Sequence, residues 1–333
     1  MLKSRKTGPC SPWLLGLAVC LFPVLRGAEP DKRIKLLCTT FPVYQITRNI
    51  ALGSAGAEVE LMIPAPMGCP HDYTLTPDDM KKLEAADALI VNGLGLEEFL
   101  GSPVEKANNR LIMIDSSAGI EDLLPYEGEE HDEDHEDEAE DGHGDEEDHE
   151  GEEAEHAHVH EGINSHLFVS PSLSARMGEN IAAELARLDP PRAGLYADNA
   201  RRYRLTMDSL SREAADLGRR LANNRIVEPH GAFDYLARDM GLAVVGVLQP
   251  HGIEPSASGI LALLETIRRE KPGAIFIEPQ YSDRTGRLVS AETGIGVFLL
   301  DPAASGPEEA PIDYFETVMR TNLATIAEAL GTK

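Results

Sequence analysis

Three histidines and one aspartate stand in loops where together they could hold a metal ion. His71 follows the second predicted strand, His166 follows a long acidic tract, and His230 follows the fifth predicted strand, while Asp301 ends the last one. A single such residue is more often a cap or a turn residue. Three neutral imidazoles with one carboxylate, however, form a closed four-coordinate set that suits Zn²⁺. His251, in a later loop, is a weaker candidate outside this set.

A second group of histidines lies in a tract over residues 127–161. The tract holds 20 Asp or Glu, seven His and no Lys or Arg. These histidines are His131, His135, His143, His149, His156, His158 and His160. With almost no apolar side chains to bury, the tract is predicted to be a disordered, solvated insertion. A run of acids alone would be read as a solubilising loop, but interspersed imidazoles and carboxylates also bind Zn²⁺ weakly at many sites.

Strand-like and helix-like segments alternate on both sides of this tract, which predicts parallel sheets with helices on their faces. The expected strands are 34–38, 59–63, 88–91 and 111–114 in the first half, and 225–227, 243–247, 274–277 and 297–300 in the second. A helix is expected over 96–108. A proline-free stretch over 192–223 predicts one helix roughly 45 Å long, which could act as a rigid connector.

The predicted fold class is therefore α/β, with two similar lobes, each a four-stranded parallel sheet flanked by helices, joined by one long rigid helix. The expected segments are a signal peptide (1–28), a first lobe (29–188) that contains the tract, a connecting helix (189–223) and a second lobe (224–333). Ligands of such sheets bind beyond the carboxyl ends of the strands. Two facing lobes would thus place His71 and His166 opposite His230 and Asp301 in one cleft.

The net charge of the chain and its amino-terminal segment indicate where the protein is located and which partners are excluded. The chain has 57 acidic and 30 basic side chains, and this acid excess argues against nucleic acid as a partner. Lys3, Arg5 and Lys6 precede an apolar run over 13–25 that is too short to span a bilayer, as in an export signal. Cleavage near Ala28 is favoured, with a lipid anchor on Cys20 as the alternative. We expect an exported protein that meets the membrane only through its partner or such an anchor.

The cysteines outside the predicted leader leave three possibilities open. Cys38 should end the first strand, and Cys69 lies in the loop after the second. In an oxidising compartment the two could form a disulfide. Two unpaired small side chains are favoured over this disulfide, and Cys69, two residues from His71, as a metal ligand is the third possibility.

Several short motifs resemble the solute-binding proteins of bacterial zinc and manganese ABC importers, over about residues 34–330. The matching stretches are Thr39–Tyr44, Pro70–Tyr73 with Thr76-Pro77, Leu89–Glu97, Glu254–Ala257 and Glu278–Gln280. The resemblance implies a metal held between two lobes by His71, His166, His230 and Asp301. Histidine at position 230 is typical of zinc-type members, whereas a carboxylate there goes with manganese. The His-rich acidic tract is also typical of zinc-type members.

These observations lead to one hypothesis with several alternatives. The chain is expected to be a periplasmic, monomeric solute-binding component, not an enzyme, that captures Zn²⁺ and delivers it to an ABC permease driven by its ATPase. Glu278 is a candidate acceptor for an N–H of a ligand histidine. The alternatives are Mn²⁺ or Fe²⁺ as cargo, an adhesin on the same scaffold, or a zinc hydrolase. The sequence has no H-E-x-x-H helix, nucleophile elbow or Walker loop, which argues against the zinc hydrolase.

Deletion of residues 127–161 distinguishes metal binding by the tract from metal binding by the predicted cleft site. The shortened protein is expected to retain one tight Zn²⁺ site and to lose the weak binding, because the four predicted ligands lie outside the tract. Isothermal titration calorimetry of both proteins measures this difference. Loss of tight binding together with the tract would contradict the prediction.

Overall fold

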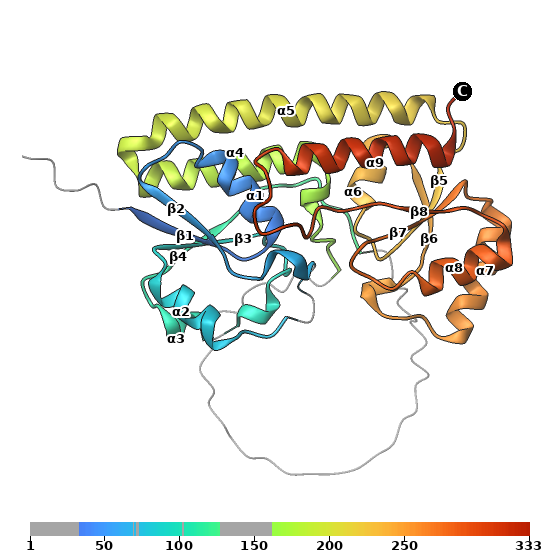
Figure 1. Cartoon of the computed structure of the whole chain (residues 1–333), viewed down its shortest axis with the longest axis horizontal. Coiled ribbons are helices and arrows are strands. Elements are labelled where there is room, and N and C mark those ends of the chain that lie inside the picture. Colours follow the sequence, from blue (N-terminus) through green and yellow to red (C-terminus); the bar gives the residue numbers. More distant parts are fainter. Residues whose placement is uncertain (1–32, 69, 71–72, 102, 127–161) are drawn as a thin grey trace, which may run out of the picture. The chain divides into compact units, whose positions relative to one another are not determined.

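Two four-stranded parallel sheets form the framework of the described part of this computed structural model (Figure 1). The structure describes residues 33–333 except 69, 71–72, 102 and 127–161. The predicted leader, the seven tract histidines, His71 and Cys69 therefore lie outside the described residues. The strand order is β2-β1-β3-β4 in the first sheet and β6-β5-β7-β8 in the second. The two sheets thus share one topology, and the predicted fold class is confirmed.

The first lobe is the one built on β1–β4. Its strands are β1 (Ile34–Cys38), β2 (Ala57–Leu61), β3 (Ala88–Val91) and β4 (Ile112–Asp115). Its helices are α1 (Phe41–Ile50), α2 (Pro77–Ala85) and α3 (Pro103–Ala107), with short 3₁₀ turns at Ala65–Met67 and Glu98–Leu100. The single helix expected over 96–108 is wrong. Gly101 has a φ of +41°, and Pro103 starts a new helix because proline disfavours a helical residue before it.

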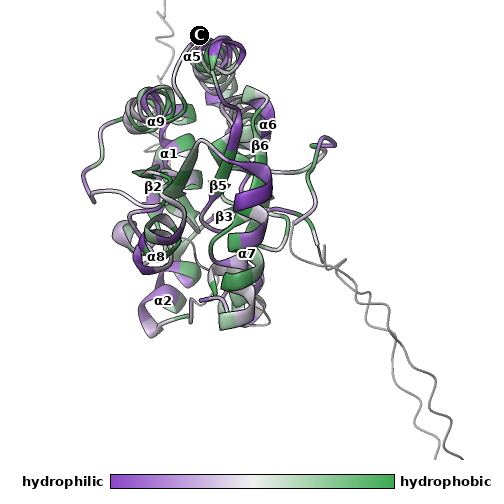
Figure 2. Ribbon diagram, turned by 90° about the vertical axis from the view of Figure 1, so that its right-hand side faces the viewer, coloured by the Kyte–Doolittle hydropathy of each residue, from purple (hydrophilic) through white to green (hydrophobic). Residues whose placement is uncertain are grey.

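The second lobe is the one built on β5–β8. Its strands are β5 (Arg225–Glu228), β6 (Ala243–Val247), β7 (Ala274–Ile277) and β8 (Val297–Leu299). Its helices are α6 (Asp234–Met240), α7 (Ala257–Glu270), α8 (Arg284–Thr293) and α9 (Tyr314–Leu330), with a 3₁₀ turn at Pro250–Gly252. In both lobes the hydrophobic residues concentrate in the sheets, while helices such as α2 are largely hydrophilic (Figure 2).

Helix α5 (Ala193–Arg220) runs along both lobes and is roughly 42 Å long (Figure 1). It packs against α4 (Pro171–Leu188) and α1, and further along against α6 and α9. Its buried residues recur at helical spacing: Tyr196, Tyr203, Met207, Leu210 and Leu217. One continuous apolar stripe therefore fixes both lobes to the same helix. The segment boundaries predicted at 28, 188 and 223 stay predictions.

A second connection between the lobes is the segment that follows Asp301. The N–H of Gly306 donates to the carbonyl oxygen of Ala65 at 2.9 Å, and Arg48 Nη1 donates to the carbonyl oxygen of Ala310 at 2.8 Å. The ring of Phe41 meets Tyr314 edge to face at 5.4 Å. The chain thus leaves the second sheet, packs on α1 of the first lobe and returns into α9. These contacts join the segment after β8 to the first lobe.

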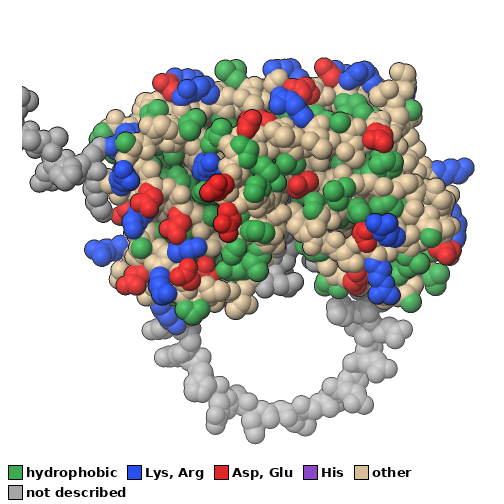
Figure 3. Space-filling view, viewed as in Figure 1, with side chains coloured by type: hydrophobic (Ala, Val, Ile, Leu, Met, Phe, Trp, Pro, Cys, Tyr) green, Lys and Arg blue, Asp and Glu red, His purple; other side chains and the backbone are tan. Residues whose placement is uncertain are grey.

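The outer surface is charged with both signs. On the face shown in Figure 3, acidic and basic side chains are interspersed, and no histidine of the described chain is visible. None of the helices in the described ranges is long and apolar enough to cross a membrane.

Gly218 tests the packing of α5 against the second lobe. A Cβ atom there would lie 1.8 Å from the carbonyl oxygen of Met240, whereas a Cβ at Gly194 of the same helix would meet nothing within 4 Å. Gly194→Ala is expected to change the free energy of unfolding by less than about 0.5 kcal/mol, because Gly194 lies in the first turn of α5 and the added Cβ meets no atom within 4 Å. Gly218→Ala is expected to lower it by about 1–3 kcal/mol through overpacking. Urea unfolding measures both, and equal effects would contradict this packing.

Candidate metal centre

His230 is fully buried in the loop after β5, and its ring is held by a carboxylate. Its Nδ1 lies 2.6 Å from Oε1 of Glu278, which follows β7. An ionised carboxylate can only accept, so Nδ1 carries a hydrogen, and in the neutral ring the lone pair is then on Nε2. This is the tautomer that a metal-binding imidazole needs, with a carboxylate behind it that raises its basicity.

His166 is also fully buried, and its ring is held by an amide. Its Nδ1 lies 2.9 Å from Oδ1 of Asn164, in the loop that leads into α4. The rings of His166 and His230 meet edge to face, with 5.0 Å between their centroids and an angle of 84°. The carbonyl oxygen of Ser165 accepts from Asn92, which follows β3, so this loop is fixed to the first lobe. Two imidazoles from different lobes therefore lie ring against ring.

Asp301 follows β8 and is held by its backbone. Its N–H donates to Asn322 Oδ1 at 3.0 Å, and Asn322 Nδ2 donates back to its carbonyl oxygen at 2.6 Å. Its carboxylate accepts from the N–H of Ala303 at 2.8 Å. Burial raises the pKa of Asp301, and the negative charge of Glu278 raises it further. Asp301 therefore lies within the electrostatic reach of the carboxylate that holds His230.

Aromatic rings surround the two histidines. Tyr281 lies 4.9 Å from the ring of His230, and Phe168 lies 5.9 Å from the ring of His166, measured between centroids. The hydroxyl of Tyr126 donates to the carbonyl oxygen of His230 at 2.9 Å. Such walls exclude water and strengthen electrostatic interactions inside. Tyr126 is also the last described residue before the tract, and its N–H donates to the carbonyl oxygen of Gly162, the first described residue after it.

Buried acidic groups lie beneath His230. Glu228 and Glu278 are 1% and 3% exposed, and Asp234 is buried as well. Burial and the charge of Asp234 raise the pKa of Glu228 well above its ordinary value, and burial also raises the pKa of Asp234. Carboxyl groups crowded in this way repel one another when they ionise, so a nearby cation would be favoured over an anion.

The described residues bring together part of the predicted ligand set. His166 and His230 lie side by side, while His71 falls outside the described residues. Within the described ranges, no group of three or more His, Cys, Asp or Glu is placed to hold a metal ion. The full set of His71, His166, His230 and Asp301 thus stays a prediction, as does weak binding by the tract. The backbone of His251 lies in the 3₁₀ turn after β6.

Cys38 is a free thiol and not half of a disulfide with Cys69. It is fully buried at the end of β1, and burial raises its pKa to about 12. Such a thiol behaves as a small apolar side chain of the core.

A buried network around Glu97 was not predicted from the sequence. One carboxylate oxygen of Glu97 accepts from Thr39 Oγ1 at 2.7 Å and from the N–H of Asn92 at 2.6 Å. The other accepts from the N–H of Gly93 at 3.1 Å. Asn92 in turn holds Ser165, the residue before His166. The only signal for this network in the sequence is the Asn-Gly stretch that ends in Glu97, which does not reveal these contacts.

Glu97→Gln tests the state of this carboxyl. Burial raises the pKa of Glu97 to about 7 from an ordinary 4.5, against the lowering effect of its hydrogen bonds, so between about pH 4.5 and 7 the folded protein binds more proton at this carboxyl than the unfolded chain does. The folded state of the wild type should therefore lose stability, relative to Glu97→Gln, as the pH rises from 5 to 8. Urea unfolding of both proteins across this range measures the difference. A difference that does not change with pH would contradict the raised pKa.

Comparisons with known proteins fit this geometry. A family model described as "Zinc-uptake complex component A periplasmic" (ZnuA) matches residues 36–329. The chain is 28% identical over 306 residues to "Zinc-binding lipoprotein AdcA" of Streptococcus pneumoniae (strain ATCC BAA-255 / R6), covering 90% of this chain and 56% of the relative. It thus spans a little over half the length of the streptococcal relatives that it matches.

A relative of similar length is "High-affinity zinc uptake system protein ZnuA" of Bacillus subtilis (strain 168). It is 27% identical over 326 residues, which cover 95% of this chain and 94% of the relative. Among solved structures, one described as "Crystal structure of ZnuA" is 26% identical and superimposes with a TM-score of 0.71, covering 90% of this chain and all of the other. Because the family model matches most of the chain, the protein belongs to the ZnuA family of periplasmic zinc-uptake complex components.

Proposed function

We propose that this protein captures Zn²⁺ outside the cytoplasm and delivers it to an ABC permease that its ATPase drives. The observation that carries the proposal is the buried pair of His166 and His230, whose Nδ1 atoms each face a hydrogen-bond acceptor. When the rings are neutral, both Nε2 atoms then present the lone pair that a zinc ion needs. Membership of a family of periplasmic zinc-uptake components supports the same conclusion.

The ion would be held by the imidazoles of His71, His166 and His230 and by the carboxylate of Asp301. These donors suit Zn²⁺, which binds imidazole nitrogen and carboxylate oxygen in a tetrahedral set. A complete set of four protein ligands leaves no open position for a water nucleophile, which argues against a hydrolase. The family consists of transport components and not of enzymes, as expected from the sequence.

Zn²⁺ is favoured over Mn²⁺ and Fe²⁺ by the nature of the ligands. Imidazole-rich sites bind Zn²⁺ more tightly, because Mn²⁺ stands at the weak end of the affinity order for divalent metals. The carboxylate of Glu278, 2.6 Å from Nδ1 of His230, raises the basicity of that ligand and strengthens the same preference.

The leader and the acidic tract would have separate roles in export and in metal collection. The leader over residues 1–28 would direct export, with a lipid on Cys20 as an alternative anchor. The tract would collect metal weakly close to the site, because Tyr126 contacts the backbone of His230 and Gly162 pairs with Tyr126. The protein would act as a monomer that meets the membrane through its permease.

His230→Ala tests the proposed site directly. In the protein without residues 127–161, this change should weaken Zn²⁺ binding more than about 100-fold, because loss of a ligand costs more than loss of a hydrogen-bond partner behind it. His251→Ala is the matched control and should keep the affinity of the parent. Competition with a chromophoric chelator measures both proteins. Equal affinities of the two variants would contradict the proposal.

A further inference from the structure

Asn164 uses every hydrogen-bonding position of its side chain, and it does so on both lobes. It is fully buried in the loop that precedes His166. Its Oδ1 accepts from the backbone N–H of His166 at 2.9 Å and lies 2.9 Å from Nδ1 of the same residue. Its Nδ2 donates to the carbonyl oxygen of Gly231 at 2.7 Å and to Oδ2 of Asp234 at 2.8 Å. An amide offers two donor hydrogens and two acceptor lone pairs, so none is left over.

The orientation of this amide follows from its partners. The backbone N–H of His166 can only donate, so the atom facing it is an oxygen. The carbonyl of Gly231 can only accept, so the atom facing it is the NH₂ group. Since the oxygen faces His166, Nδ1 of that ring must donate, and in the neutral ring the lone pair is then on Nε2. A single amide thus selects the tautomer of His166.

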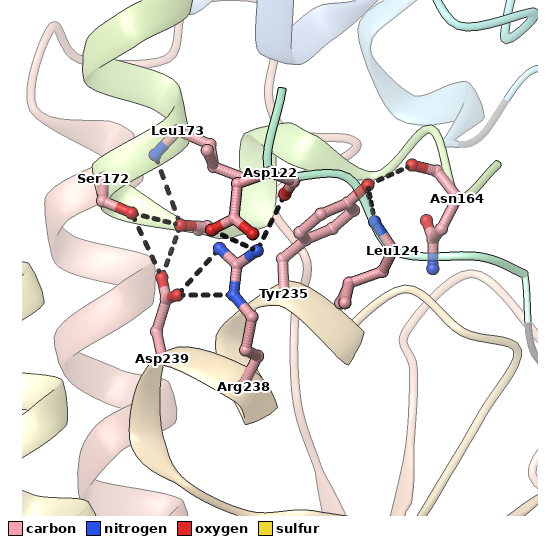
Figure 4. Close-up of polar contacts among 9 residues, drawn as sticks. Asp122, Leu124, Asn164, Ser172, Leu173, Tyr235, Arg238 and Asp239 are labelled. Atoms are coloured by element: carbon pink, nitrogen blue, oxygen red, sulfur yellow. Dashed lines mark hydrogen bonds and ion pairs between the residues drawn. The ribbon is translucent and has the colours of Figure 1, made fainter. Parts of the chain in front are cut away.

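The same side chain joins the two loops that carry the paired histidines. Gly231 follows His230 and has a φ of +89°, a conformation that favours glycine. The backbone of Asn164 is fixed as well: Tyr235 donates its hydroxyl to the carbonyl oxygen of Asn164 at 2.7 Å, and the N–H of Leu124 donates to that hydroxyl at 3.1 Å (Figure 4). Asn164 therefore holds His166 and the loop of His230 against one another.

The two imidazoles consequently have different supports. His230 faces the carboxylate of Glu278, whereas His166 faces a neutral amide. An aspartate at position 164 would supply a carboxylate to His166 as well. It would also place a second negative charge against Asp234 and the carbonyl oxygen of Gly231, where Asn164 now donates. An amide behind His166 thus avoids placing a second carboxyl group against Asp234.

We propose that Asn164 is a positioning residue for the metal site: it selects the tautomer of His166 and couples that ligand to the loop of His230. This inference rests on the proposed function, since it takes both histidines to be ligands. Three variants test it: Asn164→Ala, Asn164→Asp and the double variant Asn164→Asp with Asp234→Asn. In the double variant the donor and acceptor exchange places, so the pair between positions 164 and 234 can form again.

Zn²⁺ affinity and dissociation rate are measured in the protein without the tract. Both single variants should lose about 10–100-fold in affinity, as is typical for residues that orient a metal ligand. The double variant should recover most of that loss. Asn199→Ala is the matched control, because Asn199 is also buried and its Nδ2 donates to the carbonyl oxygens of Ile50 and Leu52 at 2.8 Å, away from the site. It should lower thermal stability and leave the affinity unchanged.

A second readout does not depend on metal binding or on any variant. In the metal-free wild type labelled with ¹⁵N-histidine, NMR should show His166 as the tautomer protonated at Nδ1. The opposite tautomer would overturn the inference, as would an Asn164→Ala protein with unchanged affinity or a double variant no better than Asn164→Asp. Failure of the proposed function is distinguishable, because the wild type would then bind no Zn²⁺ tightly while the tautomer still reported on Asn164.

Discussion

The structure depends on the burial of two imidazoles, from two different lobes, each with an acceptor behind its ring. Burying a polar ring without partners is costly, and the hydrogen bonds of Asn164 and Glu278 offset that cost. They also turn both Nε2 atoms into acceptors. Buried carboxyl groups lie beneath His230 and aromatic rings lie around the pair, surroundings that favour a cation.

Two connections between the lobes support the placement of the two histidines. Helix α5 carries one apolar stripe past both sheets, and the segment after Asp301 crosses to α1 before it returns to α9. His230 itself follows β5, and the residues that hold the two histidine loops also follow strands: Asn92 follows β3 and Glu278 follows β7. Helix α5, on which α1 and α4 pack at one end and α6 and α9 further along, connects the strand ends of the two sheets.

Hydrophobic periodicity predicted the strands and the two-lobed fold from the sequence. Strands 34–38, 88–91, 243–247 and 274–277 have the predicted bounds, because short apolar runs between helical segments are a strong signal. The helix over 96–108 was wrong because Pro103 and Gly101 outweigh the apolar spacing. Asn164 and Glu97 were missed because hydrogen bonds to Gly231 and Thr39 join residues 67 and 58 positions apart, which no local pattern encodes. The possible disulfide is not formed, and Cys38 is a free thiol buried in the core at the end of β1.

The central claim is that one Zn²⁺ is held by three imidazoles and one carboxylate between the lobes. X-ray absorption spectroscopy at the zinc edge tests it most directly, on the protein without residues 127–161 and with one equivalent of Zn²⁺. The account predicts four nitrogen or oxygen ligands at about 2.0–2.1 Å with the multiple scattering of three imidazoles. A spectrum with one imidazole or none, or with sulfur at about 2.3 Å, would contradict it.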